Sequence, residues 1–147
     1  NTPYLIPDNE MITALCIAAQ NGLDVRIVTP HKGDKWYVHL VTRSYYRQLV
    51  EAGVKIYEYS PGFIHSKTFL ADDELATIGT PNLDCRSLYM HFECGVWMYR
   101  TRAVKELKED FLATLDDCMQ IGPKDFKSVK IYVRILQCIL RIFAPLL

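Results

Sequence analysis

The sequence predicts an α/β fold with a mixed, largely parallel sheet flanked by helices, followed by an amphipathic C-terminal helix. Short apolar runs alternate with segments of helical periodicity, and tight strand–helix–strand connections are typical of right-handed parallel crossovers. The 147 residues are 50% hydrophobic and 12% aromatic, which suffices for one domain with a real core. A formal net charge of +0 argues against a broad basic surface, and so against nucleic acid as a partner.

The chain opens with a short strand at 4–6 and a first helix. Asp8 or Asn9 can cap this helix, because apolar residues recur at helical spacing from there to Ala19. Gly22 is expected to end it in a left-handed conformation.

The next three elements form the predicted crossover. A strand at 25–28 stops at Pro30, a helix runs from 36 to 52, and Gly53 leads into a strand at 54–57. This order makes the sheet at least partly parallel.

A hairpin is expected next. One strand covers 67–71, acidic residues form the turn at 72–74, and the second strand returns over 75–78. Strand formers at 93–99 predict a further central strand, and an apolar stripe predicts a helix over 103–119.

The tail differs from the rest of the chain, so we divide the sequence into residues 1–122 and an amphipathic segment, 123–147. Between 129 and 143 nearly every residue is apolar except one polar row on the expected helix: Lys130, Arg134, Gln137 and Arg141. Two interpretations stay open. The cations suit an anionic membrane surface, or the helix docks on the core or on a second half of the protein.

The cysteine pattern bears on the redox environment of the protein, and the first residue bears on whether the sequence is a fragment. The five cysteines are scattered and form no C-x-x-C pair, which favours reduced thiols over disulfides or a zinc site. No signal peptide or bilayer-length apolar run is present. Because the sequence begins with Asn1, we expect a fragment whose missing half could hold membrane segments.

The candidate site begins with the pattern H-x-K-x-x-x-x-D. On a strand, side chains at i and i+2 share a face, so His65 and Lys67 are expected to project into one site. Asp72 falls out of that phase, which makes it a turn or support residue. A histidine beside a fixed cation suits nucleophilic or acid–base chemistry on an anion.

Further polar residues follow at short distance. Thr80 and Asn82 follow Gly79 in a G-T-x-N pattern and supply donors for a phosphate group. Glu93 adds a second acidic residue on a later strand. The combination makes a chance occurrence of the pattern a poor explanation.

The pattern from His65 to Asp72 resembles the HKD motif of the phospholipase D superfamily. The similarity extends to the C-terminal half of bacterial cardiolipin synthases through the amphipathic end and four stretches: PYLIPD, DVRIVTP, RSYYRQLVEAGVKIYEY and PGFIHSKTFLADDELATIGTPNLDCRS. Three positions depart from the family pattern: Thr80 replaces a serine, Pro81 a small residue, and His91 an asparagine.

The resemblance implies phosphatidyl transfer through a phosphohistidine, forming cardiolipin from two phosphatidylglycerol molecules. It implies neither metal nor other cofactor, because lysines and amides supply the positive field. Residues 1–122 then form a phospholipase D-like catalytic half-domain. The second HKD motif comes from an N-terminal half or, in an isolated fragment, from a homodimer. The expected location is the cell membrane, with the catalytic domain at its cytoplasmic face.

The family also implies residue roles. Lys67 neutralises the phosphoryl oxygens, and Asn82 donates to one of them with help from Thr80. Glu93 accepts a hydrogen bond from the ring of His65. Whether His65 is the nucleophile or the general acid stays open, because the answer depends on the second motif.

Two other functions remain as alternatives. One is a phospholipase D-type phosphodiesterase or nuclease acting as a homodimer, which the neutral charge disfavours. The other is a non-catalytic lipid-binding module, which has no need to keep Lys67 beside His65.

Overall fold

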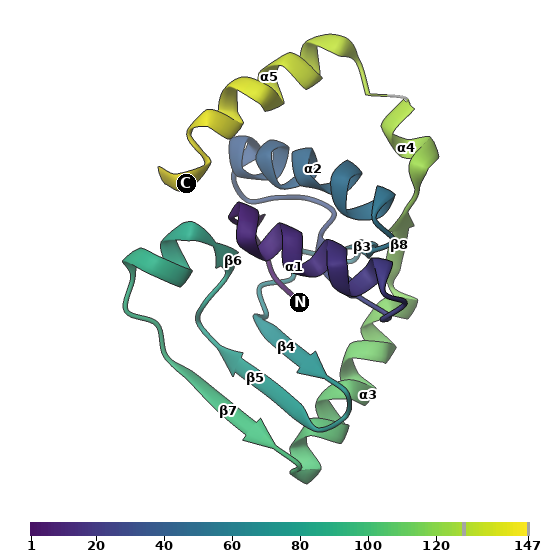
Figure 1. The fold of residues 1–147 in the computed structure, drawn as a ribbon, viewed down its shortest axis with the longest axis vertical. Helices are drawn as coiled ribbons and strands as arrows, with labels where there is room; N and C mark the ends of the chain where they lie inside the picture. The colour runs from purple at the N-terminus through teal and green to yellow at the C-terminus, as the bar shows by residue number, and fades with distance from the viewer. Residues whose placement is uncertain (128, 147) are drawn as a thin grey trace.

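The computed structural model describes residues 1–127 and 129–146. Figure 1 shows the order and arrangement of its elements. The strands are β1 Leu5–Ile6, β2 Arg26–Pro30, β3 Lys55–Tyr59, β4 Thr68–Ala71, β5 Leu75–Gly79, β6 Leu83–Asp84, β7 Gly95–Tyr99 and β8 Cys118–Ile121. The helical elements are α1 Asn9–Gln20, α2 Trp36–Glu51, a π-helical turn η1 Arg86–Met90, α3 Arg102–Asp116, α4 Pro123–Lys127, α5 Ile131–Ile142 and a 3₁₀ turn η2 Ala144–Leu146.

Strand pairing is mixed, which together with the flanking helices confirms the α/β class. The pairs β1–β6 and β2–β3 are parallel, and α2 connects β2 to β3 as the predicted crossover. The pairs β3–β8, β4–β5 and β5–β7 are antiparallel. Parallel pairing is thus confined, within the described residues, to two of the pairs.

The helix boundaries follow from local chemistry. The Asp8 carboxylate accepts a hydrogen bond from the backbone N–H of Met11 at 2.8 Å, so Asp8 is the residue that caps α1. Gly22 and Gly53 follow α1 and α2 with φ angles of 89° and 101°. Both termini are therefore confirmed, because this backbone region is open to glycine at little cost.

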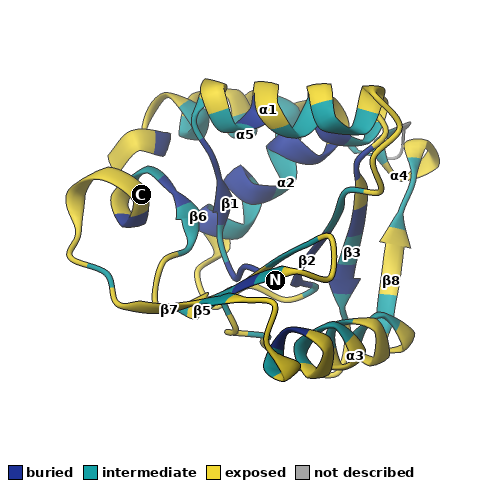
Figure 2. Ribbon diagram, turned by 60° about the horizontal axis from the view of Figure 1, so that its bottom comes forward, coloured by how far each residue is buried: buried dark blue, intermediate teal, exposed yellow. Residues whose placement is uncertain are grey.

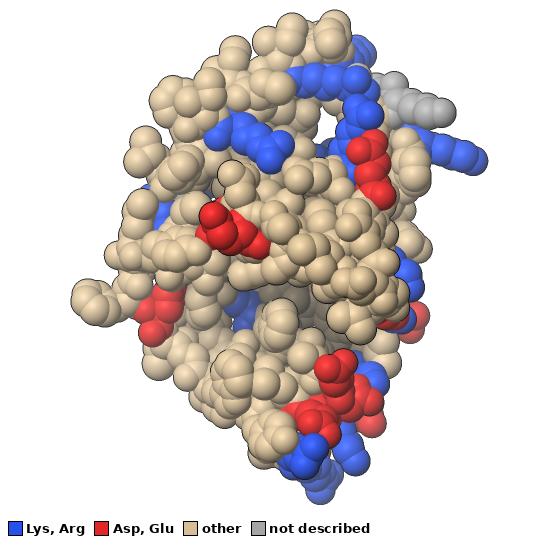
Figure 3. Space-filling view, viewed as in Figure 1, with Lys and Arg blue, Asp and Glu red and all other residues tan. Residues whose placement is uncertain are grey.

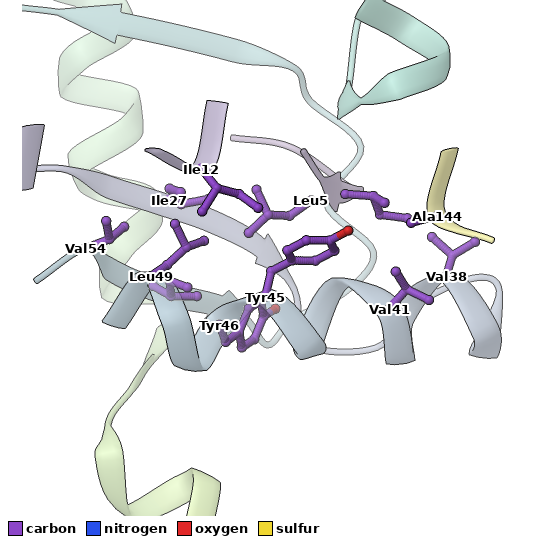
Figure 4. Close-up of a cluster of buried hydrophobic side chains, with 12 residues drawn as sticks. Leu5, Ile12, Ile27, Val38, Val41, Tyr45, Tyr46, Leu49, Val54 and Ala144 are labelled. Atoms are coloured by element: carbon purple, nitrogen blue, oxygen red, sulfur yellow. The ribbon is translucent and has the colours of Figure 1, made fainter. Parts of the chain in front are cut away.

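The main hydrophobic core lies where α1 and α2 pack against β1, β2 and β3. Figure 4 shows side chains of these elements converging, and Figure 2 shows the buried residues concentrated there. The fully or nearly fully buried members include Leu5, Val41, Tyr46, Leu49 and Ile56. This part of the chain therefore carries its own core.

The predicted hairpin is confirmed as β4 and β5. Its turn places Asp72 and Asp73 at φ 51° and 60°, a conformation that aspartate tolerates better than most residues. The strand predicted as central is instead an edge strand. Within residues 1–127 and 129–146, β7 pairs with β5 alone in the order β4-β5-β7, and four of its five residues are exposed.

The helix predicted over 103–119 is too long at its C-terminal end. α3 stops at Asp116, and Cys118 to Ile121 form β8 against β3. The apolar stripe of the helix continues into this strand, so periodicity alone did not separate the two elements.

The tail forms α4 and α5, and Ser128 and Leu147 of the predicted segment 123–147 lie outside the described residues. The polar row of α5 faces α2 instead of pointing outward, as the hydrogen bond from Gln137 Nε2 to the Leu40 carbonyl oxygen at 3.2 Å illustrates. Within the described part of the chain, every helix is too short or too polar to cross a bilayer.

Candidate active site

The segment that carries His65 and Lys67 precedes the hairpin and lies outside its strands. β4 begins at Thr68, so the expectation that both residues lie on a strand is wrong. The ladder nevertheless reaches this segment, because the backbone N–H of Gly79 donates to the Lys67 carbonyl oxygen at 3.2 Å. The site residues are thereby fixed to one end of the hairpin. His65 is exposed, and the centroid of its ring lies 5.5 Å from the ring centroid of Phe63.

The structure brings four of the predicted residues to one cleft of ≈ 640 Å³. Figure 3 shows the molecule hollowed near the start of β4, with cationic side-chain atoms set back in the hollow. Different elements supply its walls: the segment before β4, the end of β5, the loop after β5, and α3. The cleft is lined by His65, Ser66, Lys67, Thr68, Ile78, Gly79, Thr80, Asn82, Leu107 and Asp110.

Lys67 supplies the cation of this cleft. Its Nζ donates to the carbonyl oxygen of His65 at 2.8 Å. Partial burial lowers the pKa of the Lys67 ammonium, while the negative charges of Glu93 and Asp84 oppose that shift. Glu93 is therefore electrostatically coupled to the cleft through Lys67.

Glu93 lies in the loop before β7, so the expectation that it lies on a strand is wrong. It is not among the residues that line the cleft, but it contacts Thr80, which does line it. The Thr80 hydroxyl donates to the Glu93 carboxylate and accepts from the backbone N–H of Cys94 at 3.0 Å. The Thr80 bond is the main reason why the pKa of Glu93 is lowered, and Ser87, His91 and Lys67 act in the same direction. The carboxylate is thus held ionised. Its predicted bond to His65 stays a prediction.

Asn82 is oriented from within the chain. Its amide Nδ2 donates to the Ser87 hydroxyl at 3.3 Å, while its Oδ1 is buried without a hydrogen-bond partner among the described residues. The backbone N–H of Ser87 in turn donates to the Asp84 carboxylate at 2.7 Å. Ser87 therefore connects Asn82 with Asp84, a role that the sequence pattern did not indicate.

Gly79 has a steric reason to be glycine. A Cβ at this position would lie 2.5 Å from the carbonyl oxygen of Cys94 and 2.7 Å from Cα of Gly95. These are backbone atoms of the neighbouring strand, so they cannot move aside cheaply. The close approach of β5 and β7 sets the position of Thr80 beside Glu93.

Asp72 lies at the opposite end of the hairpin, in the turn between β4 and β5. It lines a second, shallow surface pocket with Arg100 and Lys105. The turn is tied down by an ion pair between Lys108 and Asp73 and by one between Arg100 and Glu74 at 2.7 Å. This geometry agrees with a supporting position in the hairpin.

Two of the cleft residues that were not predicted as site residues lie far from the motif in the sequence. Leu107 and Asp110 both come from α3, where Leu107 belongs to the predicted apolar stripe. No local pattern distinguishes Asp110 from the other acidic residues of that helix. In the described residues, no three His, Cys, Asp or Glu side chains are grouped as metal ligands would be.

Comparison with known proteins gives consistent matches. A family model described as "Cardiolipin synthase, PLD-like domain" matches residues 1–115. The chain is 46% identical over 146 residues to a cardiolipin synthase of Geobacillus sp. (strain WCH70), and 45% identical to one of Halalkalibacterium halodurans. Each match covers 99% of this chain but 29% of the relative, so the chain spans less than a third of their length.

Solved structures share the fold. A phosphatidylserine synthase of Haemophilus influenzae aligns over 99% of this chain and 38% of its own, with a TM-score of 0.73 and 16% identity. The phospholipase D family member Nuc of Salmonella typhimurium aligns over 81% of this chain and 78% of its own, with a TM-score of 0.68 and 17% identity.

Proposed function

The chain belongs to the PLD-like domain family of cardiolipin synthases, and on this premise we propose that it is the C-terminal half of a phosphatidyltransferase. The whole enzyme would join two phosphatidylglycerol molecules into cardiolipin and release glycerol. The observation that carries the proposal is the single cleft lined by His65, Lys67, Thr80 and Asn82. A histidine, a cation and neutral donors are the groups that a phosphodiester requires.

The proposed reaction has two displacements at phosphorus. A histidine nitrogen attacks the phosphorus of one phosphatidylglycerol, the bond to the glycerol oxygen breaks, and a second histidine protonates the departing glycerol. The second histidine then removes the proton from a hydroxyl of another phosphatidylglycerol. That oxygen attacks phosphorus, the phosphorus–nitrogen bond breaks, and cardiolipin leaves. We assign His65 to the second role, as general acid and then base.

The other groups position and stabilise. Lys67 would balance the charge that accumulates on the phosphoryl oxygens, and rotation of its Nζ away from the His65 carbonyl would free it for substrate. The Asn82 amide and the Thr80 hydroxyl would donate to the same oxygens. Glu93, held ionised, would fix the tautomer of His65, while Asp72 would support the hairpin.

The site needs a partner because this chain contributes one HKD motif. We propose that an N-terminal half of the same protein supplies the second, or that a twofold dimer of the isolated chain imitates it. The other partner is phosphatidylglycerol or a related phospholipid at an anionic membrane surface. We place the catalytic domain at the cytoplasmic face, which the five free cysteines support.

The transferase is favoured over the two alternatives. Relatives named cardiolipin synthase match over 99% of this chain at 42–46% identity. The grouping of His65 and Lys67 in one cleft also supports catalysis over a purely lipid-binding role.

A transfer assay on the intact, two-motif protein tests the proposal. With labelled phosphatidylglycerol, we expect cardiolipin and free glycerol, and a loss of turnover of about a hundredfold or more in His65→Ala. Because His65 is exposed, the variant should melt like the wild type. An unchanged rate would remove His65 from the chemistry. Release of phosphatidic acid instead of cardiolipin would favour the phospholipase.

A further inference from the structure

Helix α5 is docked with its polar residues inward. Gln137 donates to the backbone of α2, and the Arg141 guanidinium lies 4.1 Å from the ring centroid of Tyr45. Arg134 donates to the Phe126 carbonyl oxygen at 2.6 Å. Three of the four residues of the polar row therefore make contacts within the chain, which fixes the rotation of the helix about its axis.

The opposite side of α5 is apolar and exposed, and we call it the outer face. The helix lies at the edge of the molecule, beside α2, in Figure 1. Ile131 and Ile142 near the two ends are 70% and 75% exposed. The face consists of Ile131, Tyr132, Ile135, Leu136, Ile139, Ile142 and Phe143. A contiguous apolar face made of seven large side chains is unusual on a protein surface that contacts only water.

The charge around the outer face is distinct from that of the rest of the chain. Residues 123–147 hold five Lys or Arg and one Asp, whereas residues 1–122 hold twelve Lys or Arg and sixteen Asp or Glu. The Lys130 ammonium lies 5.8 Å from the ring centroid of Tyr132, at the start of the face. Cations thus gather in the segment that presents the apolar side chains.

We propose that the outer face of α5 docks on an anionic phospholipid bilayer, with the helix lying in the plane of the interface. Apolar side chains then enter the acyl boundary, and the exposed Lys130 at the start of the face meets the headgroups. The proposal deepens the proposed function by giving the enzyme a contact with its lipid surface. The docking proposal rests on the proposed function only in the choice of phosphatidylglycerol as the anionic lipid.

The positive charge of residues 123–147 also indicates which kind of partner binds the outer face of α5. A second copy would bring two tails of the same positive sign together, which is unfavourable. A protein partner would have to supply an acidic rim around an apolar groove. An anionic bilayer offers both properties over an extended surface.

Flotation of the 147-residue chain with vesicles tests the proposal. Vesicles of phosphatidylcholine with and without phosphatidylglycerol are compared for the wild type and for the double variant Ile135→Asp, Ile139→Asp. We expect binding to the anionic vesicles, weakened at least tenfold in the double variant, and weak binding to phosphatidylcholine alone. The control carries the two changes Ile17→Asp and Leu23→Asp, since both side chains are exposed and far from α5 in the sequence, and it receives the same two charges.

The possible results separate the occupants. If the wild type fails to bind, or if the double variant binds as well as the control, the proposal is wrong. A change of oligomeric state in the double variant with vesicle binding intact would assign the face to a second copy. Circular dichroism of each variant verifies that α5 stays folded.

A second arm keeps this proposal apart from the proposed function. In the intact protein, His65→Ala should abolish transfer but leave vesicle binding unchanged. The α5 double variant should keep transfer with substrate in detergent micelles and lose it with substrate in vesicles. Loss of transfer in both media would indicate a role of α5 in folding or in the site.

Discussion

Two parts of the chain differ in how far their apolar side chains are buried. Residues 1–59 bury twelve hydrophobic residues and leave three large ones exposed: Ile17, Leu23 and Trp36. Residues 68–99 bury Ala76 and leave nine large hydrophobic residues exposed, among them Phe92 and Trp97. We call them the core region and the hairpin region. The first is stabilised by its own packing, and the second presents a surface that suits a partner.

The site lies at the junction of the two. His65 and Lys67 follow the last strand of the core region, and Thr80 and Asn82 belong to the hairpin region. One side of the cleft is thus anchored on a closed core. The other continues into an open apolar surface, which supports the proposal that the site is completed by another half.

The largest effect on stability is expected in the core region. Leu49→Ala removes a fully buried side chain of α2 and should lower the free energy of unfolding by about 2–5 kcal/mol. Urea unfolding measures the change, with Leu23→Ala as the exposed control. A cost below that of the control would show that the core region is not the stabilising unit.

In the hairpin region the expected effect falls on activity. Glu93→Gln in the intact protein should lower turnover by at least about tenfold if Glu93 has the proposed role, because an amide would not hold the imidazolium of His65 as a carboxylate would. The melting temperature should change little, since Glu93 is partly exposed. Steady-state kinetics decide the matter, and wild-type turnover would remove Glu93 from the site.

Acid should weaken the core region through a buried carboxylate. Burial raises the pKa of Glu58, but hydrogen bonds from Arg43 at 2.7 Å and with His31 at 2.8 Å outweigh it and leave the pKa lowered. A lowered folded-state pKa stabilises the fold above the ordinary value of 4.5, and this stability is lost as the pH falls through the folded-state value.

Urea unfolding between pH 7 and pH 3 should therefore give a falling free energy of unfolding, and Glu58→Gln should flatten the slope. The variant will also be less stable at neutral pH, because Arg43 loses its charged partner. An unchanged slope would show that other carboxylates account for the acid response.

The smallest effect on stability is expected in the hairpin region, at an exposed side chain of its sheet. Trp97→Ala, on the edge strand β7, should change the free energy of unfolding of the isolated chain by less than about 0.5 kcal/mol, since the side chain is 69% exposed. The same change should weaken assembly with the second half, which sedimentation would detect. A stability loss comparable to that of Leu49→Ala would mean that the hairpin region has a core of its own.

The features of the fold that the sequence predicted correctly are those set by residues close together in the chain. The cap at Asp8, the left-handed Gly22 and the acidic hairpin turn depend on neighbouring residues, and each appears where its pattern indicated. The grouping of His65 with Lys67 followed from motif spacing, although the strand argument for it was wrong.

Features set by distant contacts could not be predicted in this way. The edge position of β7 depends on strand order, and β8 becomes a strand because β3 offers it a pairing edge. The inward polar row of α5 is set by the Leu40 carbonyl oxygen, 97 residues away from Gln137 in the chain. The entry of Asp110 into the cleft depends on how α3 packs on the hairpin sheet.

The most direct test of the account is the activity of the isolated chain. Purified residues 1–147 are assayed for cardiolipin formation from phosphatidylglycerol, alone and mixed with a separately produced half that carries the other HKD motif. We predict little or no product from the chain alone and recovery of transfer in the mixture. Robust cardiolipin formation by the chain alone, as a monomer, would contradict the claim that it supplies one wall of a two-histidine site.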